Sequence, residues 1–240
     1  MHSSTVVIGA GRVGRTVAAR LGARLVGREA EPDVDGCRLL LIATPDASIR
    51  SVCETLAPRL PADAAVVHFS GATSIHALDA APGATACVHP LQTVWAERGP
   101  DQLEGAYAAV TGDRALGDEL ARELGMTPFA LADEAKPVDH AASAFASNYL
   151  VTLTQVAIGL MERAGLDREL ARRALRPLQE RTLEVASSPP TGPIARGDAA
   201  TVEAHLEAIG AELAPLYRAL GRATLPIVPA ASAAAVEQLL

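Results

Sequence analysis

The sequence predicts an α/β protein in which an open, mainly parallel sheet is followed by an all-helical part. Short apolar runs alternate with helical patterns up to about Leu131, which is typical of such a sheet. The first apolar run leads directly into a glycine-rich turn, and no strand pattern follows Asp133. A chain of 240 residues can form one or two domains, and we expect a boundary near residue 132.

The opening run Thr5–Ile8 enters a Gly-x-Gly-x-x-Gly turn, and an alanine-rich helical pattern leaves it. In a dinucleotide-binding turn the first glycine allows a sharp bend, the second lets backbone approach a pyrophosphate, and the third lets the helix pack close to the sheet. The helix N-terminus offers free N–H groups to the phosphates. The alternative is a glycine-rich turn that binds no ligand. The cofactor contacts predicted in this turn are Gly9, Gly11, Arg12, Val13 and Gly14.

The residue that ends the second strand distinguishes NADP from NAD. An acid at this place bonds the ribose 2′-OH, whereas an arginine suits a 2′-phosphate. In the run Ala23–Arg28 the place falls on Gly27 or Arg28, so the sequence favours NADP. Arg12 is a second possible phosphate contact. Glu29 could still reach a ribose, which leaves NAD open, and Arg28 could instead be a solvated loop charge.

The segment between Arg28 and Arg38 is too short and polar for a full strand and helix, so we expect a shortened sheet. Continuous apolar runs after it indicate strands that are buried on both faces. The further strands are expected at Arg38–Thr44, Ala64–Phe69, Thr85–His89 (followed by a loop to Thr93), Ala106–Val110 and Pro128–Leu131, with helices at about Ala47–Leu56 and Ala115–Leu124. After these, helices are expected over Val138–Val185 and Thr201–Leu220, with a break at Pro189–Pro193 and an alanine-rich tail of uncertain order at Ala230–Leu240.

Ligands of such sheets bind at the carboxyl ends of the strands. Thr44 and Pro45 end one strand and Ser70 follows another, so all three are predicted cofactor contacts, although Thr44–Asp46 could also simply cap a helix. His68 and His89 end strands that look adjacent, and both could face one crevice. We assign His89 and Gln92 to the substrate; the alternative is that the histidines only cap strand ends. Two histidines without a partnering cysteine or carboxylate at ligand spacing predict no metal site.

Composition narrows the class of protein. The net charge of −7 disfavours a nucleic-acid partner. There is no run of 18 apolar residues, so no membrane span is expected. The first strand begins within five residues of the start, which leaves no room for a signal peptide. Cys37, Cys53 and Cys87 are isolated and are expected to be small buried thiols in a reducing compartment, so we expect a cytoplasmic protein.

Six motifs occur in order along nearly the whole chain: Gly9-Ala10-Gly11-Arg12-Val13-Gly14, Ala43-Thr44-Pro45-Asp46, His68-Phe69-Ser70-Gly71, His89-Pro90-Leu91-Gln92-Thr93, Ser147-Asn148-Tyr149-Leu150 and Thr191-Gly192-Pro193-Ile194-Ala195-Arg196-Gly197-Asp198. With them the chain resembles the bacterial Rossmann-like proteins that carry a helical C-terminal domain of unknown function. These are distant relatives of pyrroline-5-carboxylate reductases, 6-phosphogluconate dehydrogenases and ketopantoate reductases.

The resemblance implies a Rossmann-type dinucleotide-binding domain at 1–132 and a helical domain like that of 6-phosphogluconate dehydrogenase at 133–240. It also implies NADP as the cofactor and a homodimer built through the helical domain, which would also contribute to the substrate site. The shortened segment after Arg28 departs from the pattern, because it removes one wall around the adenine.

The segment that opens the helical part carries the candidate catalytic residues. On a helix His140, Ser143 and Ser147 form a polar stripe, with Lys136 one turn earlier and Asn148 about 80° round. Dehydrogenases of the related families place a lysine or histidine and an asparagine on the corresponding helix. We therefore expect His140 to be the proton donor, Asn148 to hold the substrate oxygen and Ser147 to contact the substrate. Lys136 is the alternative donor or a carboxylate anchor, while the structural alternatives are a hydrogen-bonded core histidine and a solvated lysine.

The loop Thr191–Asp198 lies between helices and carries a positive fork at Arg196. We assign Thr191, Gly192 and Arg196 to a substrate carboxylate, since pyrroline-5-carboxylate reductases hold one in a similar loop. A structural turn is the alternative, in which Asp198 caps the next helix or pairs with Arg196.

The sequence thus predicts an NADP-dependent oxidoreductase that reduces a small carboxylate-bearing ketone or imine, with a ketopantoate-like 2-oxo acid as the specific expectation. A small-molecule substrate and a homodimer follow from this hypothesis. The alternative is a protein on a reductase fold that senses NADP(H) or binds a partner without catalysis, because fold alone does not decide function. A deazaflavin-dependent reductase is a third possibility.

Overall fold

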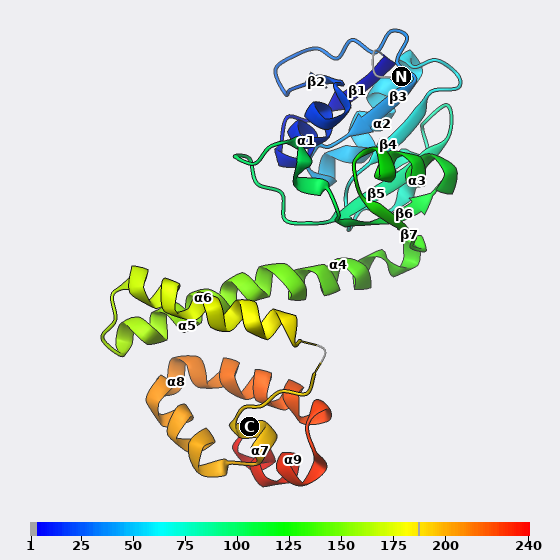
Figure 1. Ribbon diagram of the computed structural model, residues 1–240. Coiled ribbons are helices and arrows are strands. Elements are labelled where there is room, and N and C mark those ends of the chain that lie inside the picture. The colour runs from blue at the N-terminus through cyan, green and yellow to red at the C-terminus, as the bar shows by residue number, and fades with distance from the viewer. Residues whose placement is uncertain (1–3, 187) are drawn as a thin grey trace. The chain divides into compact units, whose positions relative to one another are not determined.

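The computed structural model describes residues 4–186 and 188–240, which form two compact units, Met1–Leu150 and Val151–Leu240 (Figure 1). The first unit is built on a seven-stranded sheet with the strand order β2-β1-β3-β4-β5-β6-β7. Its strands are β1 Thr5–Ile8, β2 Arg24–Val26, β3 Leu39–Ile42, β4 Ala65–His68, β5 Thr85–Leu91, β6 Tyr107–Gly112 and β7 Thr127–Ala130. All neighbouring strands are parallel except β5 and β6. The predicted mainly parallel sheet is therefore confirmed.

Successive strand residues point to opposite sides of the sheet, and helices bury both sides. Val7, Leu41 and Val67 pack with α1 (Arg12–Leu21) and α3 (Arg114–Glu123) in one apolar core. Their neighbours Val6, Leu40 and Val66 pack with α2 (Ile49–Leu56) in a second core on the other face. Cys37 and Cys53 lie in this second core, and Cys87 is also buried, so the prediction of buried thiols is confirmed.

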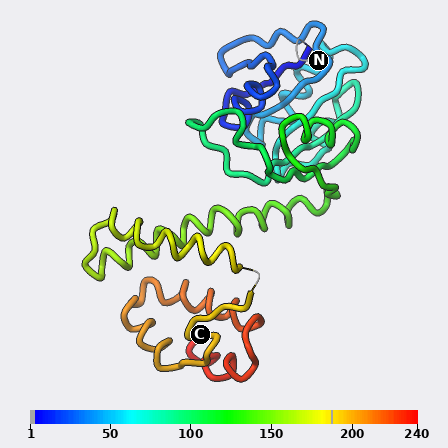
Figure 2. The backbone as a smooth tube through the Cα atoms, viewed as in Figure 1, coloured from blue at the N-terminus to red at the C-terminus, as the bar shows by residue number. Residues whose placement is uncertain are grey.

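The chain between β2 and β3 is a loop without a helix, which Figure 2 shows as a long excursion at the edge of the unit. Arg24 forms an ion pair of 2.8 Å with Asp33, and the Arg59 guanidinium donates to the Pro32 carbonyl at 2.9 Å. These contacts tie the loop to β2 and to the segment after α2. The shortened sheet expected from the sequence is thus confirmed.

The change from strands to helices comes after β7, but α4 (Lys136–Ala144) and a π-helical turn at Phe145–Tyr149 still belong to the first compact unit. The second unit contains α5 to α9, and α5 begins at the unit boundary. Their bounds are α5 Leu150–Arg163, α6 Arg168–Glu184, α7 Pro193–Arg196, α8 Ala199–Thr224 and α9 Ala230–Val236.

Two features of the second unit differ from the sequence expectation. The helix expected at Thr201–Leu220 is longer and is broken at Gly210, whose φ of 78° and ψ of 176° are not helical. The alanine-rich tail is ordered: Val236 and Leu240 pack on Val202 in a small core. Burial of these two apolar side chains explains why a tail of low complexity folds.

The helical stretch Asp133–Arg163 has 31 residues and a mean hydropathy of 1.3 over its most apolar window. By length and composition alone, this stretch is long and apolar enough to cross a membrane. Some helices of water-soluble proteins meet the same two criteria. The absence of a membrane span stays a prediction.

The glycine turn provides a test of the packing. A Cβ atom on Gly14 would lie 1.8 Å from the Gly9 carbonyl oxygen, whereas a Cβ atom on Gly11 would meet nothing within 4 Å. We expect Gly14→Ala to lower the free energy of unfolding by about 3 kcal/mol or more because overpacking forces backbone shifts. Gly11→Ala should cost less than about 1 kcal/mol, as a change at a helix N-cap. Urea unfolding of both variants measures this, and equal losses would contradict the packing described.

Candidate active site

The turn after β1 places the N-terminus of α1 at the carboxyl edge of the sheet. Gly9 has a φ of +111°, which side chains other than glycine rarely adopt, and a Cβ atom there would lie 2.5 Å from the Ala43 carbonyl oxygen. Gly14 packs against Gly9 and Ala43, while Gly11 faces open space. The three glycines therefore occupy the environments expected of a turn that bends, admits a ligand and packs on the sheet.

The first turn of α1 is open to an anion. Gly11 is its N-cap residue and makes no side-chain capping hydrogen bond, and the first turn contains no acidic residue. The N–H groups of Arg12, Val13 and Gly14 thus start the helix without a capping side chain, in the partial positive charge of the helix dipole. These residues fit the phosphates of a dinucleotide, because Gly11 leaves the space that such a group needs.

Two further strand ends lie beside this turn. Thr44 and Pro45 follow β3, and the buried Oγ1 atom of Thr44 has no hydrogen-bond partner among residues 4–186 and 188–240. Pro45 is exposed and precedes a short 3₁₀ turn. The Ser70 hydroxyl closes its own turn: it donates to Thr73 Oγ1 at 2.9 Å and accepts from the Thr73 N–H at 2.9 Å. The buried hydroxyl of Thr44 thus has no partner within the described part of the chain, whereas the hydroxyl of Ser70 is engaged in its own turn.

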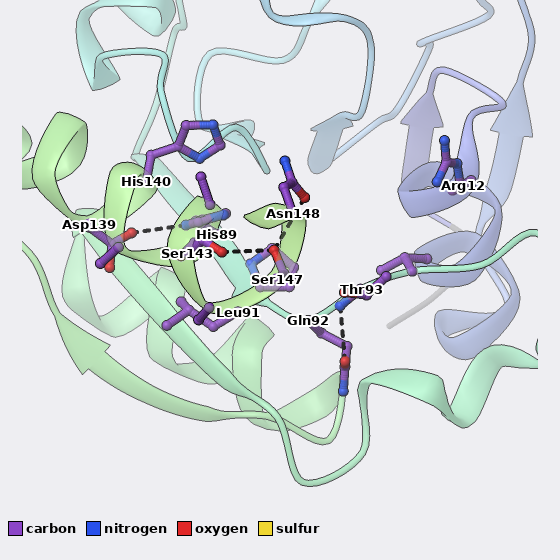
Figure 3. Close-up of a pocket in the computed structure, with 15 residues that line it drawn as sticks. Arg12, His89, Leu91, Gln92, Thr93, Asp139, His140, Ser143, Ser147 and Asn148 are labelled. Carbon is purple, nitrogen blue, oxygen red and sulfur yellow. Dashed lines mark hydrogen bonds and ion pairs between the residues drawn. The ribbon is translucent and has the colours of Figure 1, made fainter. Parts of the chain in front are cut away.

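A cleft of about 600 Å³ extends from the start of α1 to α4, entirely within the first unit (Figure 3). β5 and the segment after it form its floor, and α4 with the π-helical turn forms one wall. Its polar lining residues are Arg12, His89, Gln92, Thr93, Asp139, His140, Ser143, Ser147 and Asn148. The structure thus brings together six residues that the sequence analysis selected: Arg12, His89, Gln92, His140, Ser147 and Asn148.

Two imidazoles and one carboxylate form the polar centre of the cleft. His89 Nδ1 lies 3.1 Å from Asp139 Oδ2, and their side chains are 13% and 12% exposed. The ring centroids of His89 and His140 are 5.8 Å apart. Gly71 makes room for both rings, because a Cβ atom on it would lie 2.6 Å from His89 Cε1 and 2.7 Å from His140 Nδ1. This arrangement can hold a polar group of a ligand and move a proton to or from it.

Lys136 does not face the cleft. Its side chain is 2% exposed, and its Nζ atom donates to the Ser70 carbonyl at 3.0 Å and to Cys87 Sγ at 2.8 Å. The alternative of a solvated charge is therefore wrong, because the Lys136 side chain is buried against Ser70, which follows β4, and Cys87 of β5. The ammonium group holds α4 to the sheet instead of reaching a ligand.

His68 and His89 do not share the cleft, although β4 and β5 are neighbours. The register pairs His68 with Cys87, so His68 lies deeper in the sheet and is fully buried. Its Nδ1 atom accepts from the Ser70 N–H at 3.2 Å. Burial and the nearby Lys136 charge lower the pKa of His68 to about 3. The expectation that both histidines face one crevice is wrong, and only His89 does.

The remaining selected residues lie elsewhere. Arg28 follows β2 and is exposed. Thr191 and Gly192 belong to the second unit, where Gly192 precedes α7. Arg196 ends α7, 4.0 Å from the Asp198 carboxylate. Asp198 caps α8, since its carboxylate accepts from the Thr201 N–H at 3.1 Å.

Asp139 and Gly71 are functional candidates that sequence reasoning gave no role. Gly71 stands in the His68–Gly71 motif, and Asp139 is next to His140, so both were near residues already selected. Only the fold shows that Asp139 meets His89, which is 50 residues away in the chain.

The neutral state of buried His68 predicts a pH effect on stability. The unfolded chain binds a proton to this ring below pH 6.5, whereas the folded chain does so only near pH 3. The ring therefore favours the folded state above pH 6.5, and this stability is lost as the pH falls. When the pH falls from 7 to 5, we expect the free energy of unfolding of His68→Asn to decrease by about 2 kcal/mol less than that of the unchanged chain. Urea unfolding at both pH values measures this, with exposed His76→Asn as control; equal pH slopes would contradict it.

Comparisons with known proteins agree with this architecture. Residues 106–224 match the family model described as Domain of unknown function (DUF2520), so the match begins within the sheet and includes α4. No curated protein matches the chain. Among solved structures, the chain is similar to a proposed NADP oxidoreductase from Bacteroides fragilis, with 17% identity, a TM-score of 0.76 and coverage of 93% of this chain and 98% of that chain.

A protein from Thermotoga maritima has 21% identity and a TM-score of 0.69 over 93% of this chain and 97% of its own. The pyrroline carboxylate reductase of Plasmodium falciparum, solved with NADP bound, has 14% identity and a TM-score of 0.62 over 98% of this chain and 96% of its own. At these identities the likeness shows a shared fold. The chain is a Rossmann-like protein with a helical C-terminal part, and its residues 106–224 match the domain of unknown function DUF2520.

Proposed function

We propose that the chain is an NADP-dependent oxidoreductase that reduces a small carboxylate-bearing ketone or imine. One observation carries the proposal: a single cleft joins the start of α1, after the glycine turn, to the imidazoles of His89 and His140. A dinucleotide whose phosphates lie at α1 extends along the carboxyl edge of the sheet. Its reactive end is then within reach of groups that can exchange a proton.

The chain's own residues supply binding and orientation for the cofactor. When bound, a reduced nicotinamide supplies a hydride to the substrate carbon. The open N–H groups of Gly11 to Gly14 suit the pyrophosphate. Thr44 and Pro45 are proposed as cofactor contacts because they follow β3 at the carboxyl edge of the sheet. Ser70 is also proposed to contact the cofactor. Its hydroxyl is engaged within its own turn, so we assign this contact to the turn as a whole.

NADP is favoured over NAD because exposed Arg28 stands just beyond β2, where no acid occupies the last strand position. A guanidinium forms charge-assisted hydrogen bonds with a 2′-phosphate. The similarity to a reductase solved with NADP bound supports the same choice. Glu29 keeps NAD as the second option.

The substrate is proposed to be a small 2-oxo acid or cyclic imine, of which a ketopantoate-like acid is the specific example. Asn148, Ser147 and Gln92 line the cleft and are proposed to contact its polar groups. Without ligand, the Ser147 hydroxyl donates to the Ser143 carbonyl at 2.7 Å and Gln92 Oε1 accepts from the Thr93 N–H at 2.9 Å. Thr191, Gly192 and exposed Arg196 are proposed to hold its carboxylate. We propose the cleft histidines rather than Lys136 as proton donors, because the Lys136 side chain is buried away from the cleft.

We also propose a cytoplasmic homodimer, in which residues 1–132 bind the cofactor and residues 133–240 supply the dimer contacts and part of the substrate site. Large apolar side chains of the helical segments are exposed in the single chain, among them Val138, Phe145 and Val151. Their burial against a second copy would remove apolar surface from water.

The first test is turnover. We expect stoichiometric NADPH to be oxidised in a single turnover by at least one member of a panel of small 2-oxo acids and cyclic imine carboxylates, as followed by NADPH absorbance. Tight NADPH binding without turnover on any member would favour a sensor, and absence of binding to both NADPH and NADH would contradict the proposal.

The second test concerns cofactor choice. Arg28→Asp should raise the Kd for NADPH about tenfold or more, because one charge-assisted hydrogen bond is lost. The Kd for NADH should rise by less than about threefold, because NADH has no 2′-phosphate. Arg38→Asp is the matched control, because Arg38 precedes β3 at the opposite end of the sheet and pairs with Asp63. Isothermal titration measures each Kd, and equal losses for both cofactors would remove the assignment of Arg28.

A further inference from the structure

The geometry points to His89 as the proton-transfer group of the cleft, with Asp139 as its positioning residue and a ketone, rather than an imine, as the substrate. This inference deepens the proposed function and rests on it. It replaces His140, which the sequence alone favours, as the acid and base of the reaction.

The contact between His89 and Asp139 fixes the imidazole in one orientation. His89 Nδ1 lies 3.1 Å from Asp139 Oδ2, and both side chains are largely buried (Figure 3). An ionised carboxylate only accepts hydrogen bonds, so Nδ1 carries the proton in this pair. The other ring nitrogen, Nε2, lies beside Gly71, where a Cβ atom would be 2.7 Å from it, and in the neutral ring it holds a free electron pair. His89 is thereby prepared to accept a proton at Nε2 and to return it.

His140 lacks this support. It is exposed, and no carboxylate lies within ion-pair distance of it among the described residues. Its neighbour Asp139 is turned to His89 instead. A catalytic group acts best when its rotamer is held by a second group. His140 is therefore assigned to contact the substrate, 5.8 Å from the His89 ring.

Four charged or titratable groups act on His89 in addition to burial. Asp139 on α4 favours the imidazolium, whereas His140 and Lys136, also on α4, oppose it. His68 on β4 also interacts electrostatically with His89. Burial is the largest effect, and the pKa of His89 is lowered from its ordinary value. In the free protein at neutral pH the ring is therefore the neutral base.

A ketone and a protonated imine differ in whether their reduction needs a proton donor, and this difference favours the ketone. In oxidation of a hydroxy acid, His89 Nε2 would accept the hydroxyl proton as the carbonyl forms, and the oxidised cofactor, when bound, would accept the hydride from the carbinol carbon. In reduction, the imidazolium would return this proton to the oxygen, and the reduced cofactor would supply the hydride to the carbon. A protonated imine needs no such donor, because hydride addition to it gives a neutral amine directly. A positioned histidine is therefore needed for interconversion of a ketone and an alcohol, but not for reduction of a protonated imine.

A measurement without substrate tests the pair. In NMR titrations of labelled histidine side chains, we expect the His89 ring to carry its proton on Nδ1 and to titrate below pH 6.5. Asp139→Asn keeps a hydrogen-bond acceptor but removes the charge, and should lower this midpoint by about one pH unit. The exposed pair His76 and Asp79, 3.1 Å apart, is the control and should not change. A proton on Nε2, or an unchanged midpoint in Asp139→Asn, would overturn the inference.

Turnover of a 2-oxo acid tests the role. His89→Gln should reduce kcat about 100-fold or more while the Kd for NADPH stays within about twofold, and His140→Gln should reduce kcat less than tenfold and raise KM. His76→Gln should leave both unchanged. Asp139→Asn should shift the acid limb of the hydroxy acid oxidation profile to lower pH, which a purely structural role would not do.

The outcomes separate the two proposals. Turnover that is unaffected in His89→Gln, or reduced more in His140→Gln, overturns the inference and leaves the reductase intact. Turnover of cyclic imines alone also overturns it. A chain that binds neither NADPH nor NADH overturns both, and if His89→Gln fails to fold, the pH profile of Asp139→Asn still decides.

Discussion

A buried ammonium group holds the proposed active site together. Lys136 Nζ donates to the Ser70 carbonyl and to Cys87 Sγ, and so fixes the start of α4 to the segment after β4 and to β5. Burying an ammonium group costs several kcal/mol unless it is well paired, and the Asp133 carboxylate nearby helps to offset this cost. Most of α4 is exposed in the single chain, so few other contacts position it. The places of Asp139 and His140, one turn further on, depend on this anchor.

The opposite end of the cleft depends on a different constraint, the absence of side chains. Gly14 lies so close to Gly9 that no Cβ atom fits between α1 and the turn after β1. This close approach brings the start of α1 to the same edge of the sheet at which β4 and β5 are covered by α4. Because the strands between them are parallel, one row of strand ends joins the two regions. The cleft thus depends on the common direction of the strands, on the close contact of Gly9 with Gly14, and on the hydrogen bonds of Lys136.

The sequence predicts what local patterns determine and misses what depends on register. The glycine turn, the buried strands and the polar stripe of α4 follow from spacing over a few residues, and all are present. The separation of His68 from His89 depends on the β4–β5 register, which pairs His68 with Cys87. The burial of Lys136 and the pairing of Asp139 with His89 join segments about 50 residues apart, and no local signal encodes such contacts. The break at Gly210 is a local feature, but a lone glycine in a helical pattern does not identify one.

The electrostatics of the cleft fit a reaction that runs in both directions. Arg12 is the only lysine or arginine among the lining residues, and Asp139 is the only acid, so the centre of the cleft carries little net charge. The charge on His89 then follows that of the molecules bound beside it. In the proposed reaction, a substrate carboxylate beside the ring would favour the imidazolium, the form that donates a proton in reduction. The cationic ring of an oxidised nicotinamide would favour the neutral base needed for oxidation. The pKa of His89 is lowered by burial and raised by one carboxylate, so its charge remains sensitive to both molecules.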